Sequence, residues 1–332
     1  MFFGKRFWLL LSILVSLSLS VNARECAVEI QGEGMHVVME NCKNIGTFSL
    51  GGIYNGGWEK LTYQYPMPWE GTFLTIRVGD KFYTNSIDPV EGDRMDQYLE
   101  QSAVVEGNKL SVKWMLPGEV LVEEVLEVIN ESTLIHVKIT NKNPAKNLDV
   151  GVRLHLDTMI GDNDGAPIYI PGDALKENEA EYSGGDLSFR YWKAYNRRDK
   201  PNIVATGILV YNDELTYPDK VVIANWKRSM WSIWDYETSE EVSVLGDSAV
   251  ILFYNPRSLG VGKTREIITG YGCGEPVLKK VSGVTEIVLS NITGEYCPGD
   301  DVVIKVDVGS EIDFLGSLDV EIRNKEGVLV YN

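Results

Sequence analysis

The alternation of apolar and polar residues is the feature that most restricts how this chain can fold. A period of two places the apolar side chains on one face of an extended strand. Roughly fifteen segments show this pattern, many of them rich in β-branched and aromatic residues, and no segment has the periodicity of a long amphipathic helix. The sequence therefore predicts an all-β protein. The clearest segments are residues 72–78, 109–115, 120–129, 133–140, 148–157, 203–211, 248–254 and 264–271.

Residues 1–23 have the pattern of a secretory signal peptide. Lys5 and Arg6 precede an apolar stretch over residues 7–21, and Val21-Asn22-Ala23 supplies the small residues of a cleavage site. The apolar stretch contains four serines and is shorter than the roughly 20 residues that span a bilayer. We therefore expect a secreted or cell-surface, extracytoplasmic protein without a transmembrane helix in its mature chain.

The remaining chain divides into two predicted domains. Residues 24–280 have the length and strand content of one large antiparallel β-sandwich. Residues 281–332 carry four shorter predicted strands, which match the opening half of an immunoglobulin-like β-sandwich. A complete sandwich of that type needs about seven strands, so either the module is incomplete or the chain continues past Asn332. We favour continuation, with further C-terminal domains, because the last strand is cut short.

The four cysteines predict disulfide bonds. An even number in an exported chain is typical of disulfide pairing, and proximity in sequence favours two pairs. No Cys-x-x-Cys occurs and no His lies close to a Cys, which disfavours a metal site. The predicted pairs are Cys26 with Cys42 and Cys273 with Cys297.

The charge balance and the missing motifs narrow the function. Asp and Glu number 48 against 31 Lys and Arg, so nucleic acids and anionic membranes are poor partners. The chain also lacks the Gly-x-Ser-x-Gly, His-Glu-x-x-His, phosphate-loop and dinucleotide-binding motifs. Common hydrolase, metalloprotease and nucleotide-binding functions therefore have no motif in their favour.

Two neighbouring predicted strands, residues 133–140 and 148–157, have one apolar and one polar face each. If they form a hairpin, matching their apolar faces places His136 opposite Arg153, with His155 and Asp157 on the same polar face. Such a group can bind a sugar or transfer protons. The alternative is the ordinary solvated side of an antiparallel sheet.

An acidic loop follows the second of these strands. Asp162, Asn163 and Asp164 offer the hard oxygen ligands that Ca²⁺ prefers, although their spacing is not that of an EF-hand. Asp, Asn and Gly also form tight turns without any metal. The loop is thus a candidate calcium site, a structural turn or a substrate contact, and no other cofactor is expected.

Aromatic residues gather in two stretches that can stack on sugar rings through their apolar faces. The alternative is packing, because large aromatic side chains are most often buried. The denser stretch contains Trp226, Trp231, Trp234 and Tyr236, and the second contains Trp58, Tyr63, Tyr65 and Trp69.

Residues 156–167, Leu-Asp-Thr-Met-Ile-Gly-Asp-Asn-Asp-Gly-Ala-Pro, resemble a motif of uncharacterised secreted or surface proteins of prokaryotes. Residues 46–52 and 269–274 are similar to the flanks of that domain, so the resemblance spans about residues 26–275. The long antiparallel strands are also similar to the galactose-mutarotase-like supersandwich of sugar epimerases, lyases and non-catalytic glycosidase domains. Mutarotases use two His and a carboxylate. This second resemblance implies that His136, His155 and Asp157 are the corresponding residues here.

These observations favour a carbohydrate-binding or structural role, with a glycan or a cell-envelope component as partner. The alternative is a carbohydrate-active enzyme, of mutarotase, epimerase, lyase or hydrolase type, that works on the polar sheet face. Hydrolysis of a glycoside requires two carboxylates, for which the sequence offers Asp157, Asp162, Asp164 and Glu237.

Overall fold

The computed structural model describes residues 26–43, 45–67, 71–86, 91–173, 175–209 and 217–273, together with four short strands between residues 286 and 331. The chain divides into two compact units, Met1–Pro276 and Val277–Asn332. The leader predicted at residues 1–23 lies outside the described residues. Within the described part, no helix is both long enough and apolar enough to span a membrane.

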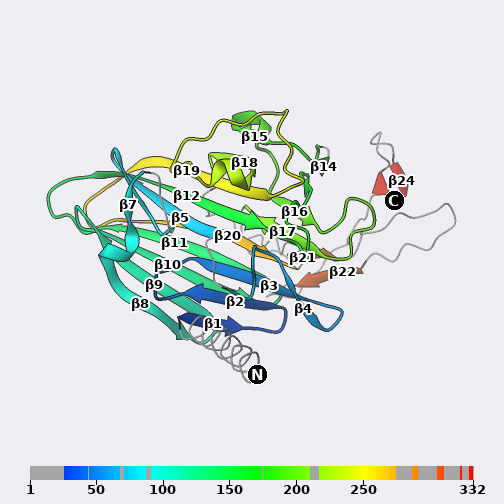
Figure 1. Cartoon of the computed structure of the whole chain (residues 1–332), viewed down its shortest axis with the longest axis horizontal. Helices are drawn as coiled ribbons and strands as arrows, with labels where there is room; N and C mark the ends of the chain where they lie inside the picture. Colours follow the sequence, from blue (N-terminus) through cyan, green and yellow to red (C-terminus); the bar gives the residue numbers. More distant parts are fainter. Residues whose placement is uncertain are drawn as a thin grey trace, which may run out of the picture. The chain divides into compact units, whose positions relative to one another are not determined.

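The first unit is built from three β-sheets (Figure 1). The smallest contains, in order, β1 (Ala27–Gln31), β2 (Met35–Glu40), β3 (Phe48–Tyr54) and β4 (Gly57–Lys60). The nine-stranded sheet has the order β14 (Leu175–Lys176), β13 (Ile168–Tyr169), β16 (Tyr191–Tyr195), β17 (Val204–Ile208), β20 (Thr264–Gly272), β11 (Ser132–Asn141), β10 (Val120–Ile129), β9 (Lys109–Leu116) and β8 (Leu99–Glu106).

The third sheet has seven strands in the order β15 (Ala180–Ser183), β18 (Lys220–Asn225), β19 (Ser248–Leu259), β12 (Leu148–Thr158), β5 (Thr72–Val78), β6 (Lys81–Thr84) and β7 (Asp93–Arg94). Apart from β7, which pairs parallel to β6, its strands are antiparallel. Helical structure among the described residues is limited to two 3₁₀ turns, Met95–Tyr98 and Gly184–Asp186, and the four-residue helix α2 (Trp226–Ser229). The predicted all-β class and the large antiparallel sandwich are thus confirmed.

One hydrophobic core joins all three sheets. It contains Leu50 of β3, Val112 of β9, Ile135 of β11 and Leu154 of β12, each almost fully buried. Along β9 and most of β11, buried residues alternate with less buried ones. The period of two in the sequence therefore marks the face that each strand turns to the core.

The predicted hairpin between residues 133–140 and 148–157 is wrong. These segments form β11 and β12, which belong to different sheets: β11 pairs with β10 and β20, whereas β12 pairs with β5 and β19. Their apolar faces both turn toward the core, so the two strands contribute to it from opposite sheets. Two strands with matching apolar faces can pair within one sheet or face each other from two packed sheets, and alternation does not distinguish the two.

The central strands of the seven-stranded sheet are buried on both faces. On the face away from the main core, Val222, Ile251 and Phe253 form a second cluster with Trp234, which comes from the connection between β18 and β19. Nine consecutive residues of β12, from Val150 to Thr158, are buried for this reason. The sheet therefore differs from an antiparallel sheet with one solvated face.

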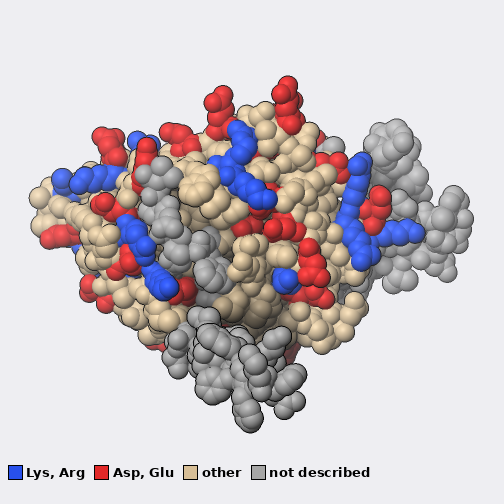
Figure 2. All heavy atoms as spheres, in the orientation of Figure 1, with Lys and Arg blue, Asp and Glu red and all other residues tan. Residues whose placement is uncertain are grey.

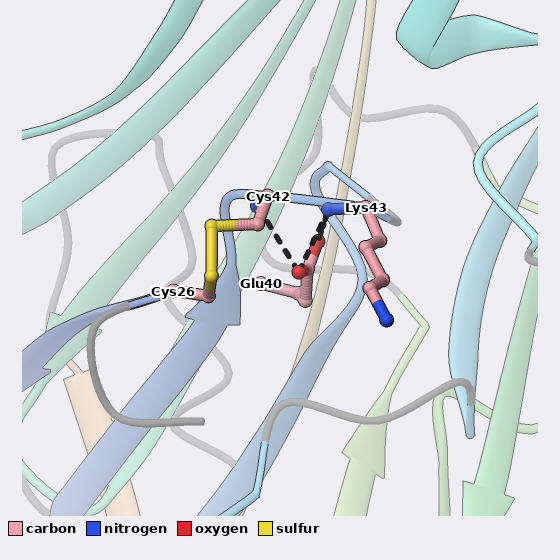
Figure 3. The surroundings of a disulfide bond; sticks show 4 residues. All are labelled: Cys26, Glu40, Cys42 and Lys43. Carbon is pink, nitrogen blue, oxygen red and sulfur yellow. Dashed lines mark hydrogen bonds between the residues drawn. A yellow bond between two sulfur atoms is a disulfide. The ribbon is translucent and has the colours of Figure 1, made fainter. Parts of the chain in front are cut away.

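The cysteine prediction is confirmed for its first pair. Cys26 and Cys42 form a disulfide that joins the start of β1 to the end of β2 (Figure 3). The Glu40 carboxylate accepts hydrogen bonds from the backbone N–H groups of Cys42 (3.0 Å) and Lys43 (2.8 Å) beside it. Cys273 is not paired with any described cysteine, and Cys297 lies outside the described residues, so the second pair stays a prediction.

The second unit contains two pairs of antiparallel strands in its described residues. They are β21 (Glu286–Ser290) with β22 (Lys305–Gly309), and β23 (Ile322–Arg323) with β24 (Leu329–Tyr331). All four overlap strands predicted from the sequence. The rest of the predicted immunoglobulin-like module lies outside the described residues.

Candidate functional site

Three of the predicted site residues share the outer face of β12. Arg153, His155 and Asp157 alternate with the core residues of this strand, and each is at most 1% exposed. The connection between β18 and β19 covers them through α2 and the residues that follow it. This face is therefore not the solvated side of a sheet.

The guanidinium of Arg153 holds this covering connection in place. Its Nη1 donates to the carbonyl oxygens of Ser232 and, at 3.0 Å, Ile233, and its Nη2 donates to the Ser232 hydroxyl at 2.8 Å. Burial lowers the Arg153 pKa to about 9, an effect that nearby Asp235 partly opposes. Arg153 is thus a positioning residue: it satisfies the carbonyl groups of Ser232 and Ile233, three and four residues after the end of α2.

His155 contacts two aromatic rings that also contact each other. The centroids of Phe73 and Trp226 are each 4.7 Å from that of the imidazole, and Nε2 lies 3.0 Å from the hydroxyl of Ser229. Burial, and secondarily the charge of Arg153, lower the His155 pKa well below its usual value. The ring is therefore neutral at physiological pH, and its packing resembles that of a core aromatic residue.

Asp157 belongs to a cluster of three carboxyl groups, which we call the carboxylate cluster: Asp157, Asp164 and Asp247. One oxygen of each lies within 4.8 Å of the others. Asp157 and Asp247 are buried, and Asp164 is partly exposed. The cluster lies where β12 ends and β19 begins, because these strands are antiparallel and Asp157 pairs with Ala249.

Backbone contacts fix the cluster. The N–H of Ser248 donates to the Asp164 carbonyl at 2.8 Å, so the loop after β12 is attached to the start of β19. Gly165 makes this approach possible, because a Cβ there would overlap the Leu245 carbonyl. Gly71 likewise leaves room for Asp157, since a Cβ at residue 71 would lie 3.3 Å from its Oδ2.

The electrostatics of the cluster disfavour three negative charges. Burial, then the neighbouring carboxylates Asp247 and Asp164, raise the Asp157 pKa well above its usual value. Burial, then Asp164, raise the Asp247 pKa to about 6, and Lys227 opposes this shift from 3.5 Å. Burial also raises the pKa of Asp164, against the effect of Lys227 and Lys60. At low dielectric such a group retains protons or binds a cation.

Of the predicted calcium ligands, only Asp164 belongs to the cluster. Asp162 is fully exposed and forms an ion pair with Lys60 at 3.0 Å. The side chain of Asn163 is used in the loop itself: its amide donates to the Asn196 carbonyl at 3.1 Å, and its oxygen accepts from the Gly165 N–H. The three adjacent residues therefore do not form one ligand set, because a tight turn points their side chains in different directions.

His136 does not join the other predicted site residues. It lies on β11, on the outer face of the nine-stranded sheet, where its ring contacts Glu266 (3.3 Å) and Glu127 (3.5 Å). Burial lowers its pKa despite these carboxylates. The combination of His136 with Arg153, His155 and Asp157 was wrong because it depended on the hairpin that the chain does not form.

The residues of the denser aromatic stretch have different environments. Trp231 is 57% exposed, whereas Trp234 is 4% exposed and packs against Phe82 and Phe253, where no glycan can reach it. Trp226 is half-buried over His155, and the half-buried Tyr236 donates its hydroxyl to Glu179. Packing thus accounts for three of the four predicted residues, and Trp231 is the one whose ring is exposed for stacking on a sugar.

The second aromatic stretch is mostly engaged as well. Tyr65 is buried and its hydroxyl lies 2.6 Å from Nδ1 of His36, while the ring of the half-buried Trp58 lies against the same imidazole. Tyr63 is half-buried near Gly71, and Trp69 lies outside the described residues. Glu237, a carboxylate considered from the sequence, is exposed and does not belong to the cluster.

Sequence reasoning missed two residues of this region, Asp247 and Glu179. The fully buried side chain of Glu179 accepts hydrogen bonds from the N–H groups of Asn225 (2.9 Å) and Ser239 (3.0 Å) and pairs with Arg228, which fixes both ends of the covering connection. Asp247 directly precedes β19, so the edge of a predicted strand was the available signal. Nothing in the sequence marked Glu179, because its partners come from distant segments.

No protein-family model matches this chain, and no curated protein matches it. Solved structures do resemble it. A galactose mutarotase-related enzyme from Lactobacillus acidophilus is 8% identical, with a TM-score of 0.45 over 75% of this chain and 98% of the other. A galactose mutarotase-like protein from Lactobacillus casei is 9% identical, with a TM-score of 0.46 over 74% and 99%. A mutant heparan sulfate lyase from Pedobacter heparinus is 11% identical, with a TM-score of 0.35 over 86% and 40%.

Galactose mutarotase-like proteins are thus among the structural neighbours of the chain.

Proposed function

We propose that this protein binds carbohydrate outside the cytoplasm, with Trp231 as the principal contact to the glycan. The observation that supports this proposal is the exposure of Trp231, which is 57%, on a connection that is otherwise closely attached to the sheet. An indole held in a fixed position offers a flat apolar face to a sugar ring at a small cost in conformational entropy.

Two buried side chains supply that attachment. Arg153 binds the carbonyl groups of Ser232 and Ile233 on the C-terminal side of Trp231, and Glu179 binds the backbone of Asn225 and Ser239 around it. Exposed tryptophan on a mobile loop would lose more freedom on binding than one fixed in this way. The geometry therefore favours a preformed contact surface.

Charge and cysteine chemistry support the type of partner and the compartment. The net charge is −17, and acidic and basic side chains are interspersed on the face that Figure 2 shows, which suits an uncharged polar ligand better than a nucleic acid. The Cys26–Cys42 disulfide supports an oxidising compartment, in agreement with the predicted leader.

A glycan array with the mature chain, residues 24–332, tests the proposal. We expect binding to at least one glycan and a loss of at least about tenfold in affinity for Trp231→Ala, because a central tryptophan is a typical hot spot. Trp231→Phe keeps an aromatic face and should retain most of the affinity. Val261→Ala, at a residue that is 45% exposed, is the matched control and should bind as the unchanged protein does.

Failure of the unchanged protein to bind any glycan or cell-wall fraction would refute the proposal and leave a structural role. Equal binding by Trp231→Ala would refute the assignment of the contact. Product analysis on any bound glycan then separates binding from turnover, and a new product would favour the carbohydrate-active enzyme instead.

A further inference from the structure

The carboxylate cluster contains buried oxygen atoms without a hydrogen-bond donor. Asp157 is 1% exposed, and neither of its carboxylate oxygens has a partner among the described residues. Asp247 is 5% exposed, and its Oδ1 also lacks a partner, as does Oδ1 of Asp164. Buried polar atoms of this kind are rare, and a bound ion is one of the standard reasons for them.

The described residues supply too little positive charge for three carboxylates. Lys227 approaches Asp247 at 3.5 Å, but its side chain is 72% exposed, and Lys60 is paired with Asp162 outside the cluster. An exposed ammonium contributes little to the stability of a buried carboxylate. A single cation can contact all three carboxylates at once, because one oxygen of each lies within 4.8 Å of the others.

We propose that Asp157, Asp164 and Asp247 bind a hard divalent cation, for which Ca²⁺ is the fitting probe. The three ligands are all carboxylate oxygens, and no His or Cys belongs to the cluster among the described residues, which disfavours zinc and other softer metals. Ca²⁺ accepts six to eight oxygen ligands in a flexible geometry, so water can complete its coordination on the side of the partly exposed Asp164.

The folding of the chain explains why this site is assembled from three segments. Asp157 ends β12, Asp247 precedes β19, and the Ser248 N–H holds the Asp164 carbonyl between them. A cation there would stabilise the junction between the strands and the loop that Gly165 brings against residues 245–246. The inference is independent of glycan binding, because it uses neither Trp231 nor any property of a sugar.

Calcium titration of the mature chain, residues 24–332, tests the site after treatment with a chelator. Calorimetry at about pH 8, where carboxyl groups are most readily ionised, measures the affinity, and thermal unfolding with and without CaCl₂ measures the stabilisation. We expect one bound Ca²⁺ and a higher unfolding temperature in its presence. Asp164→Asn and Asp247→Asn should each weaken binding by at least about tenfold and remove most of the thermal shift.

Asp162→Asn is the matched control. It removes the same charge from the same loop, but at a fully exposed side chain outside the cluster, so its affinity for Ca²⁺ should change less than about twofold. Circular dichroism without metal checks that the Asn variants fold, and Asp164→Asn, at the partly exposed position, is the mildest of them.

Three outcomes would overturn the proposal. Absence of binding and of any thermal shift in the unchanged protein would mean that the cluster holds protons only. Full retention of calcium binding by Asp164→Asn and Asp247→Asn would place the ion elsewhere. Equal losses in Asp162→Asn and Asp247→Asn would show a general effect of charge and not a site.

Discussion

Glu124 is the residue whose environment conflicts most with its chemistry. Its side chain lies on the core face of β10, between Val112 and Val137 of the neighbouring strands, and is fully buried. Neither carboxylate oxygen has a donor among the described residues, and burial raises its pKa well above the usual value. The folded protein therefore keeps a proton that the unfolded chain releases above about pH 4.3.

A raised pKa in the folded state makes the contribution of Glu124 to the free energy of unfolding depend on pH. Because its pKa is raised in the folded state, the contribution of Glu124 is fully present below the unfolded pKa and is lost as pH rises toward the folded pKa. We expect Glu124→Leu to raise the free energy of unfolding at neutral pH by about 1–3 kcal/mol, since it replaces an unsatisfied carboxyl group by an apolar side chain of similar size.

Denaturant unfolding of both proteins between about pH 4 and 8 measures this effect. The gain should grow with pH over that interval, and Glu123→Gln, at the adjacent position that pairs with Lys113 on the outer face, should show no such trend. A gain that does not vary with pH, or a loss of stability, would contradict the assignment of Glu124 as a buried and protonated group.

At the scale of elements, the connection between β18 and β19 depends on Arg153. Removing its guanidinium leaves buried carbonyl groups at Ser232 and Ile233 without their donor. We expect Arg153→Met to lower the free energy of unfolding by about 2–3 kcal/mol, the range for hydrogen bonds to a charged group. Arg153→Lys should recover only part of this loss, because an ammonium group cannot donate in the same planar geometry.

Hydrogen exchange should locate the effect in residues 225–236 while the amides of β12 and β19 stay protected. Arg257→Met is a suitable control: Arg257 is on β19 but pairs with Asp219 at an exposed position, so its loss should cost less than about 1 kcal/mol. Uniform acceleration of exchange throughout the sheet would indicate a general loss of stability and would contradict a local role for Arg153.

At the scale of the molecule, the three large sheets enclose a core within the first unit. Every member of that core precedes Pro276, where the division between the units falls. We therefore expect a chain limited to residues 24–276 to fold alone, because it keeps all the described side chains of this core. Its circular dichroism should be that of a β protein, and its unfolding temperature should lie within a few degrees of the matching transition of residues 24–332.

A matched truncation makes the comparison sharper. Residues 24–258 end within β19 and lack β20, which pairs with both β11 and β17 in the nine-stranded sheet, so this shorter chain should not fold cooperatively. Failure of residues 24–276 to unfold cooperatively would show that the second unit is needed for the stability of the first.

Sequence alone determined the class of the protein and most of its strands. The predicted segments 72–78 and 120–129 coincide with β5 and β10, and the segment 148–157 differs from β12 by one residue. It also identified the Cys26–Cys42 disulfide and one member of the carboxylate cluster from the acidic loop. These successes share a physical reason: alternation, loop length and turn chemistry act between residues close in sequence, where the pattern can be read directly.

Only the tertiary structure decided which strands pair and which polar groups meet. The sequence could not show that β11 and β12 lie in different sheets, that Arg153 and Glu179 fix a cover over the polar face, or that Asp247 joins Asp157 across some ninety residues. Each of these contacts depends on the pairing of distant strands. An alternating pattern specifies the two faces of a strand, but it does not specify what lies against either face.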